Sequence, residues 1–269
     1  MKTSGPRLLL HGYSAGLFVF LYAPILVLIA FSFNSAEQTA TWSGLTLRWY
    51  RELWADSTVW SAGWNSMRIG VATTLSATLI GTAASLGLRS ASEKLLRFAT
   101  PLLLLPVVLP EIVMAVSLLG LFSALGANLG FLTVWIAHVV FSVSYVVVVV
   151  RARLSGMDMA LEEAAADLGA TPWVTLWTVT LPQLYPAVIS GALLVLTLSI
   201  DDYLITSFVA GIGNTTLPLQ IYAMVRKHIT PEINAICTLL LVATTAMILV
   251  AASLERRALS SRSERATQG

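Results

Sequence analysis

Three acidic residues stand inside long apolar stretches of this sequence, where carboxylates are rare. Glu111 lies in one such stretch, and Asp201 and Asp202 lie side by side in another. A charged residue near the centre of a bilayer costs roughly 2.5–3.5 kcal/mol on insertion scales, so each of these acids needs a function or a partner. Carboxylates along a membrane path would attract cations, and aromatic faces would add cation–π contacts. The candidate residues for a substrate path are therefore Asp201, Asp202, Glu111, Tyr203 and Trp42.

Structural explanations for these acids also stay open. Glu111 could be a protonated, hydrogen-bonded carboxyl, and the aspartate pair could sit at a helix break and cap backbone N–H groups. Pro106 and Pro110 are expected to break the helix just before Glu111, and such irregularity is tolerated where it lines a cavity. No basic residue within the apolar stretches is placed to neutralise the acids. His138 has no acid in its own stretch, which favours a packed neutral histidine over a proton relay.

The elements that hold these residues are membrane spans. Of the 269 residues, 57% are hydrophobic and 11% are charged, whereas a soluble domain has about 25% charged residues. The mean hydropathy is +0.80. A transmembrane helix needs about 20 apolar residues, and the segments that qualify are 12–34, 66–88, 101–124, 131–151, 186–210 and 235–254. We predict an all-α membrane protein with six transmembrane helices and no separate soluble domain.

Lysine and arginine fix the predicted orientation. If the N-terminus lies inside, most of the 16 Lys and Arg residues fall on the inner side, so both termini are expected to be cytoplasmic. The outer segment 37–64 is rich in tryptophan, which predicts an interfacial helix. Asn65–Ser66 is expected to cap the second span, and Thr230–Pro231–Glu232 to begin the sixth.

The inner loop 152–185 is too polar to span a membrane. Met159–Leu168 has the composition of a short helix, and Gly169 is expected to end it. Thr171–Pro172 predicts the cap and first residue of a second short helix, which we expect to end at Leu181–Pro182. Two rigid helices could dock a partner, but from the local pattern alone an ordinary helical connection is a slightly better explanation.

The spacing in this loop resembles a known motif. Glu163-Ala164-Ala165, three residues, Gly169, nine residues, Val179, one residue and Leu181-Pro182 are similar to the EAA loop of ABC importer permeases, with Val179 in place of isoleucine. The resemblance implies a coupling helix seated in a groove of an ATP-binding subunit. The implied coupling residues are Glu163, Ala164, Ala165, Asp167, Gly169, Leu181 and Pro182.

The same resemblance implies a type I ABC importer permease fold and a non-catalytic chain. The sequence contains no phosphate-binding loop, so two partner ATPase subunits would use ATP and Mg²⁺, and this chain would bind no cofactor and no metal. A homologous second permease and an extracytoplasmic binding protein would complete the importer. The implied domains are an N-terminal part over 1–61, a transmembrane core over 62–255 that contains the loop 152–185, and a cytoplasmic tail over 256–269.

The substrate is suggested by a narrower resemblance. Residues 199–208, 105–111, 42–50 and 230–235 are similar to the second permease subunit of spermidine/putrescine transporters of the bacterial inner membrane. That resemblance implies import of a polyamine. Polyamines carry two or more ammonium groups, so acids spaced along a path suit them.

Two alternatives stay open at this point. The first is the same kind of importer for another substrate, namely an opine-like amine, an aminophosphonate or ferric iron. The second is a secondary carrier powered by a proton gradient, with Asp201 or Glu111 as the proton site. The loop at 163–182 argues against a secondary carrier, because such a carrier needs no ATPase dock.

Overall fold

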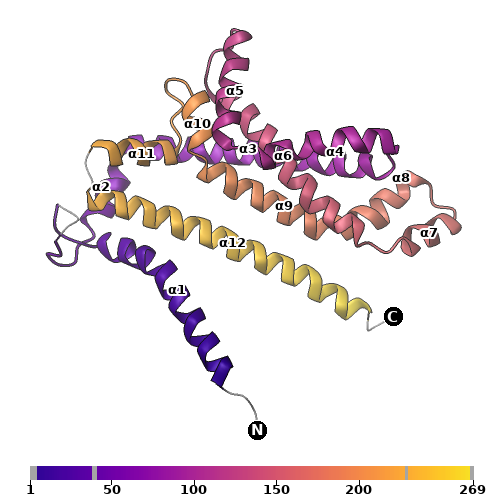
Figure 1. The fold of residues 1–269 in the computed structure, drawn as a ribbon, viewed down its shortest axis with the longest axis horizontal. Coiled ribbons are helices and arrows are strands. Elements are labelled where there is room, and N and C mark those ends of the chain that lie inside the picture. The colour runs from indigo at the N-terminus through magenta and orange to yellow at the C-terminus, as the bar shows by residue number, and fades with distance from the viewer. Residues whose placement is uncertain (1–4, 38–40, 228–229, 267–269) are drawn as a thin grey trace. The chain divides into compact units, whose positions relative to one another are not determined.

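The computed structural model describes residues 5–37, 41–227 and 230–266, which fold into helices (Figure 1). In chain order these are α1 (Gly5–Phe31), α2 (Arg48–Ala55), α3 (Ser57–Arg89), α4 (Glu93–Val108), α5 (Glu111–Ala124), α6 (Phe131–Ser155), α7 (Ala160–Asp167), α8 (Pro172–Thr175), α9 (Leu181–Asp201), α10 (Leu204–Val209), α11 (Leu217–Lys227) and α12 (Pro231–Ala266). A π-helical turn, η1 (Leu176–Thr180), joins α8 to α9.

Among the described residues, five helical stretches are long and apolar enough to cross a membrane. They are His11–Phe31, Ser57–Arg89, Phe131–Ser155, Pro172–Asp201 and Pro231–Leu249. The helices α4 and α5 pass the same test only as a pair, and they are bent by 108° at the break between them. The prediction of an all-α membrane protein with several spans is therefore confirmed for the described residues.

The span predicted over 101–124 is corrected to two helices that meet at a sharp angle. Leu109 and Pro110 have extended ψ values of 139° and 132°, so the helix ends at Val108 and restarts at Glu111. A proline disfavours helical backbone at the residue before it, which explains the position of the break. The break expected before Glu111 is confirmed at Pro110, whereas Pro106 lies inside α4 without ending it.

The N-cap predicted at Asn65–Ser66 is wrong, because α3 already begins at Ser57. Both side chains instead bind the segment that leads into α11. The Asn65 Nδ2 atom donates to the Thr215 carbonyl at 3.2 Å, and the Ser66 Oγ atom accepts from the Leu217 N–H at 2.8 Å. Polar residues inside a long helix therefore fix a neighbouring loop here.

Tertiary contacts divide the chain into two units. The first contains residues 1–60 and 221–243, and the second contains residues 61–220 and 244–269. In the first unit, the fully buried Asn34 organises the segment after α1. Its Oδ1 atom accepts from the Ser43 N–H at 3.0 Å, and its carbonyl accepts from the Trp49 indole N–H at 2.7 Å. The helix in the tryptophan-rich segment is α2, which buries Trp49 and Leu53.

The second unit is built around α6, which packs against α4, α9 and α10. Figure 1 shows α6 alongside α9, with α7 and α8 near one end of α9 and α10 at the other. Helix α3 approaches α6 closely at Gly81, where an added Cβ would lie 2.6 Å from the Val146 Cβ. Small residues at such contacts let the backbones of membrane helices pack together.

We expect Gly81→Ala to destabilise the protein, because overpacking a close helix contact costs about 1–3 kcal/mol. Gly87→Ala is the matched control, since it lies in the same helix and its added Cβ would meet no atom within 4 Å. Thermal unfolding of detergent-purified protein should show a clearly lower midpoint for Gly81→Ala than for Gly87→Ala. Equal midpoints would contradict this account of the α3–α6 contact.

Candidate functional site

The loop after α6 contains a short helix that ends as the sequence predicts. Helix α7 is closed by Gly169, whose φ of +85° is disfavoured for residues with a side chain. The Gly169 N–H donates to the Ala166 carbonyl at 2.9 Å, and the Ala170 N–H donates to the Ala165 carbonyl at 3.0 Å. This pair of bonds is a Schellman closure, so the predicted glycine stop is confirmed.

The second helix of the loop begins as predicted but does not end as predicted. The Thr171 Oγ1 atom accepts from the Val174 N–H at 3.4 Å, and Pro172 is the first helical residue. The predicted end at Leu181–Pro182 is wrong, because α8, η1 and α9 form one helical stretch from Pro172 to Asp201. The π-helical turn before Pro182, in which the Leu181 N–H donates to the Leu176 carbonyl, accommodates the proline without ending the helix.

The predicted coupling residues cluster on one accessible element. No residue of α7 is fully buried, and Glu163, Ala164, Asp167 and Gly169 are exposed. Large apolar side chains are exposed beside them: Leu168 is 90% exposed, and Trp173 of α8 is 67% exposed. Exposed apolar residues grouped in this way are typical of an interaction surface. Leu181 and Pro182 lie apart from this group, at the start of α9.

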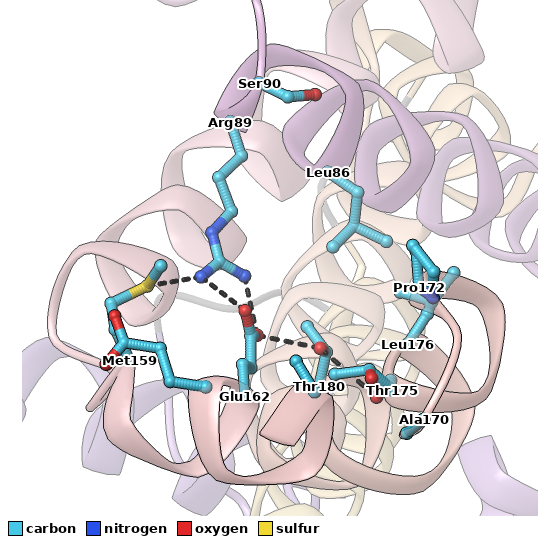
Figure 2. Close-up of a pocket in the computed structure, with 12 residues that line it drawn as sticks. Leu86, Arg89, Ser90, Met159, Glu162, Ala170, Pro172, Thr175, Leu176 and Thr180 are labelled. Atoms are coloured by element: carbon cyan, nitrogen blue, oxygen red, sulfur yellow. Dashed lines mark hydrogen bonds and ion pairs between the residues drawn. The ribbon is translucent and has the colours of Figure 1, made fainter. Parts of the chain in front are cut away.

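An open groove of about 730 Å³ lies between α7, α8 and the end of α3 (Figure 2). Across it, the Arg89 guanidinium donates to both carboxylate oxygens of Glu162, at 2.7 and 2.8 Å. The Thr180 hydroxyl donates to the same carboxylate at 2.8 Å. Arg89 also contacts the Met159 sulfur. These contacts tie α7 to α3 and to the π-helical turn.

The ion pair across this groove is formed at neutral pH. The hydrogen bond from Arg89 lowers the pKa of the Glu162 carboxyl from its ordinary value of 4.5, and partial burial opposes that shift. Because the folded-state pKa is lowered, the stabilisation is present above pH 4.5 and is lost as the pH falls through the folded-state value. The Glu162 carboxylate is therefore charged, and paired with Arg89, throughout the physiological pH range.

The acidic pair lies at the other end of α9, where the helix breaks. Helix α9 ends at Asp201, and Asp202 has an extended ψ of 120°. The Asp202 carboxylate accepts from the Thr206 N–H at 2.8 Å and from the Thr206 hydroxyl at 2.7 Å. The fifth span, predicted over 186–210, is therefore interrupted at residues 202–203, and Asp202 caps the short helix α10.

His138 is packed, as the sequence analysis expected, but its contact with Asp202 was missed. Its side chain is fully buried in α6, and its Nε2 atom lies 3.2 Å from the Asp202 carboxylate, which is only 6% exposed. The other ring nitrogen lies 2.8 Å from the Ser199 Oγ atom. The expectation that no basic residue within the apolar stretches lies close to the acids is corrected for Asp202, because His138 lies beside its carboxylate. The one signal for the pair was a histidine in one apolar stretch and an acid in another.

The remaining candidate path residues are not brought into this buried cluster. The residue Asp201 is exposed at the end of α9, and Glu111 is exposed at the first position of α5. Tyr203 is partly buried in the break between α9 and α10. Trp42 belongs to the first unit, where its ring meets Phe31 edge-on at a centroid distance of 5.8 Å.

Comparison with known proteins shows the family to which this chain belongs. Residues 77–259 match the family described as the inner membrane component of binding-protein-dependent transport systems. The chain belongs to this family. It is 44% identical over 234 residues to a putrescine transport system permease protein, PotI, of Escherichia coli K12, which covers 83% of this chain and 82% of that protein. It is 39% identical over 250 residues to a spermidine/putrescine transport system permease protein, PotC, of the same strain, covering 93% and 95%.

Solved structures of ABC importers share the fold. The chain aligns with a TM-score of 0.74 to a chain of a bacterial alginate ABC transporter in complex with its periplasmic protein, at 16% identity and covering 93% of each chain. It aligns with a TM-score of 0.62 to a chain of the MetNI methionine ABC transporter, at 19% identity and covering 75% of this chain and 97% of the other. This chain thus has the fold of an ABC importer permease. Such permeases are transport components without catalytic activity.

We expect Asp202→Ala to be strongly destabilising and Asp201→Ala to be tolerated. The variant would leave the buried N–H and hydroxyl of Thr206 and the His138 ring without their carboxylate partner, and each buried polar group left unpaired costs about 1–3 kcal/mol. The neighbouring Asp201 is exposed and so provides a matched control. Thermal unfolding midpoints in detergent would distinguish the two variants, and similar midpoints would contradict a structural role for the Asp202–His138 pair.

Proposed function

We propose that this chain is a permease subunit of an ATP-driven polyamine importer of the bacterial inner membrane. The observation that carries the proposal is identity of 39–44% over most of the chain to permeases named for putrescine and spermidine transport. In the proposed assembly it forms the translocation path with a second, homologous permease. Two ATP-binding subunits and an extracytoplasmic substrate-binding protein complete the importer.

We propose that α7 docks on the ATPase. Its exposed face carries Glu163, Ala164 and Asp167, and its Gly169 closure makes it a rigid unit. In this arrangement ATP and Mg²⁺ are used by the partner, and this chain binds no cofactor. The loop then lies on the cytoplasmic side, with both termini, as the distribution of lysine and arginine favours. The shared transport core is proposed to span residues 62–255, preceded by 1–61 and followed by the tail 256–269.

We propose that the acids of the second unit have different roles, one structural and the others in contact with substrate. The Asp202 carboxylate already accepts hydrogen bonds from Thr206 and lies within hydrogen-bond distance of the buried His138 ring, so it is poorly available to an ammonium group. Asp201 and Glu111 are exposed and keep their carboxylates available. We propose these two as the acidic contacts along the path, with Tyr203 and Trp42 as aromatic contacts.

The other substrates receive less support. Acids along the path argue against an anion such as an aminophosphonate. Among the described residues no group of three or more His, Cys, Asp or Glu side chains could hold a metal ion, which gives ferric iron no site there. A proton-coupled carrier would leave the α7 surface without a partner. An opine-like amine differs from a polyamine because it also carries carboxylates. An importer specific for such an amine would not accumulate labelled putrescine or spermidine in the uptake assay below.

Uptake by reconstituted importer tests the proposed substrate. In proteoliposomes that contain both permeases and the ATPase, supplied with the binding protein, labelled putrescine or spermidine should accumulate only with ATP. Asp201→Asn should raise the apparent KM about tenfold, since a charge-assisted contact contributes about 1.5–3 kcal/mol. Glu93→Gln is the control, because Glu93 is an acid of α4 whose side chain is 89% exposed.

Two outcomes would contradict the proposed function. They are ATP-dependent uptake of a non-amine control without uptake of polyamines, and uptake driven by a proton gradient alone. An unchanged KM for Asp201→Asn would overturn only the role of Asp201 and leave the proposed substrate standing.

Docking at α7 is tested by Gly169→Val. A β-branched residue is strained at a φ of +85°, so the closure of α7 should be lost while the spans still insert. Gly156→Val is the matched control, because Gly156 lies in the same loop with an ordinary φ of −101°. Gly169→Val should lose co-purification with the ATPase and most uptake. Normal uptake by Gly169→Val would exclude the docking role.

A further inference from the structure

The groove between α7, α8 and α3 contains a polar link whose function the docking role does not explain. Glu162 points into the groove, which the exposed Glu163 and Ala166 of α7 also line. There Arg89 and Thr180 converge on the Glu162 carboxylate (Figure 2). The side chains of Arg89 and Glu162 are 26% and 18% exposed. A docking surface needs Glu163 and its neighbours exposed, but it does not need Glu162 fastened to two other elements.

The link joins three separate elements at their ends. Arg89 is the last residue of α3, Glu162 lies in the first turn of α7, and Thr180 is the last residue of the π-helical turn before α9. Because α7 has no fully buried residue, apolar packing holds it weakly to the spans. A bidentate guanidinium–carboxylate contact fixes both distance and direction, which few exposed apolar contacts do.

Helices α3 and α9, to which Arg89 and Thr180 link α7, can transmit a displacement across the membrane. Helix α3 has 33 residues and α9 has 21, and both are continuous away from this groove. At 1.5 Å per residue, α9 alone is about 30 Å long and ends beside the acidic pair. A π-helical turn is a weak point in a helix and is frequently found at functional sites. Thr180 therefore joins Glu162 to the segment of the α8–α9 stretch that can most easily change its winding.

We propose that Arg89, Glu162 and Thr180 transmit the movement of α7 to α3 and α9. Arg89 and Glu162 are positioning residues that touch neither nucleotide nor substrate. The inference rests on the proposed function, because it takes α7 to be moved by the ATPase. It adds the side chains that convert this movement into a displacement of the spans, and it separates docking, through Glu163 and the exposed face, from transmission, through Glu162.

The test measures transported polyamine per ATP hydrolysed. The variants are Arg89→Gln, Glu162→Gln and their double mutant, in the complete importer reconstituted in phosphatidylethanolamine–phosphatidylglycerol vesicles. Each single variant should still co-purify with the ATPase and hydrolyse ATP, while spermidine imported per ATP falls about tenfold, since a charge-assisted contact is lost. The double mutant should be no worse than the singles, because the two residues act through one contact.

Two further variants sharpen the result. Arg89→Lys keeps the charge but loses the fork geometry, so it should give an intermediate ratio. Arg97→Gln is the control, because Arg97 pairs with Glu93 at 3.9 Å on an exposed surface and should leave the ratio unchanged. A link that is only structural would lower protein yield and both activities together, without changing their ratio.

The outcomes separate this inference from the proposed function. If the wild-type importer neither binds an ATPase nor imports polyamine, the proposed function fails. If the wild type imports but Arg89→Gln and Glu162→Gln keep the normal ratio, the transmission role alone is overturned. It is also overturned if these variants lose the ATPase on purification, because the link would then serve docking.

Discussion

Polar groups buried at membrane depth must find partners inside the protein, because the hydrocarbon offers none. The α9–α10 break meets this constraint through Asp202. Its carboxylate accepts from the Thr206 N–H exposed by the break, and the His138 ring of α6 lies 3.2 Å from the same carboxylate. Ser199 occupies the remaining nitrogen of the histidine. With these contacts the chain can interrupt a span without leaving the interrupted backbone unpaired, and the interruption presents Asp201 at the end of α9.

The same constraint is met differently at the other irregular points. At Pro110 the chain turns sharply, and the proline needs no hydrogen-bond acceptor for its nitrogen. At the start of α9, the π-helical turn lets the helix pass Pro182 without a break. The irregularities thus lie at the ends of α9 and between α4 and α5, whereas α6 is continuous and packs against α4, α9 and α10. A continuous central helix with breaks around it is an arrangement in which neighbouring segments can move while the core stays packed.

Local signals in the sequence predict local features well. The Gly169 stop, the Thr171 cap and the break before Glu111 each depend on the backbone preferences of one or two residues, and each is found where expected. The errors occur where contacts with distant segments or unusual turns decide the structure. Asn65 and Ser66, for example, lie inside α3 and bind the segment before α11. Pro182 predicts a helix end, but no sequence signal predicts the π-helical turn that accommodates this proline. His138 and Asp202 come from different helices more than 60 positions apart, so their contact follows from tertiary packing alone. The capping explanation left open for the acidic pair is the one that the geometry of Asp202 supports.

The polar contacts near the two ends of α9 differ in character. Near Thr180 the contacts are ionic and accessible, on the side of the loop whose spacing resembles that of ABC importer permeases. Near Asp202 they are buried, and the adjacent Asp201 is exposed. In the proposed importer, the first end would face the ATPase and the second end the substrate path. The contacts of Asp202 with Thr206 and His138 lie within the protein, so they would hold the break in place whichever molecule passes.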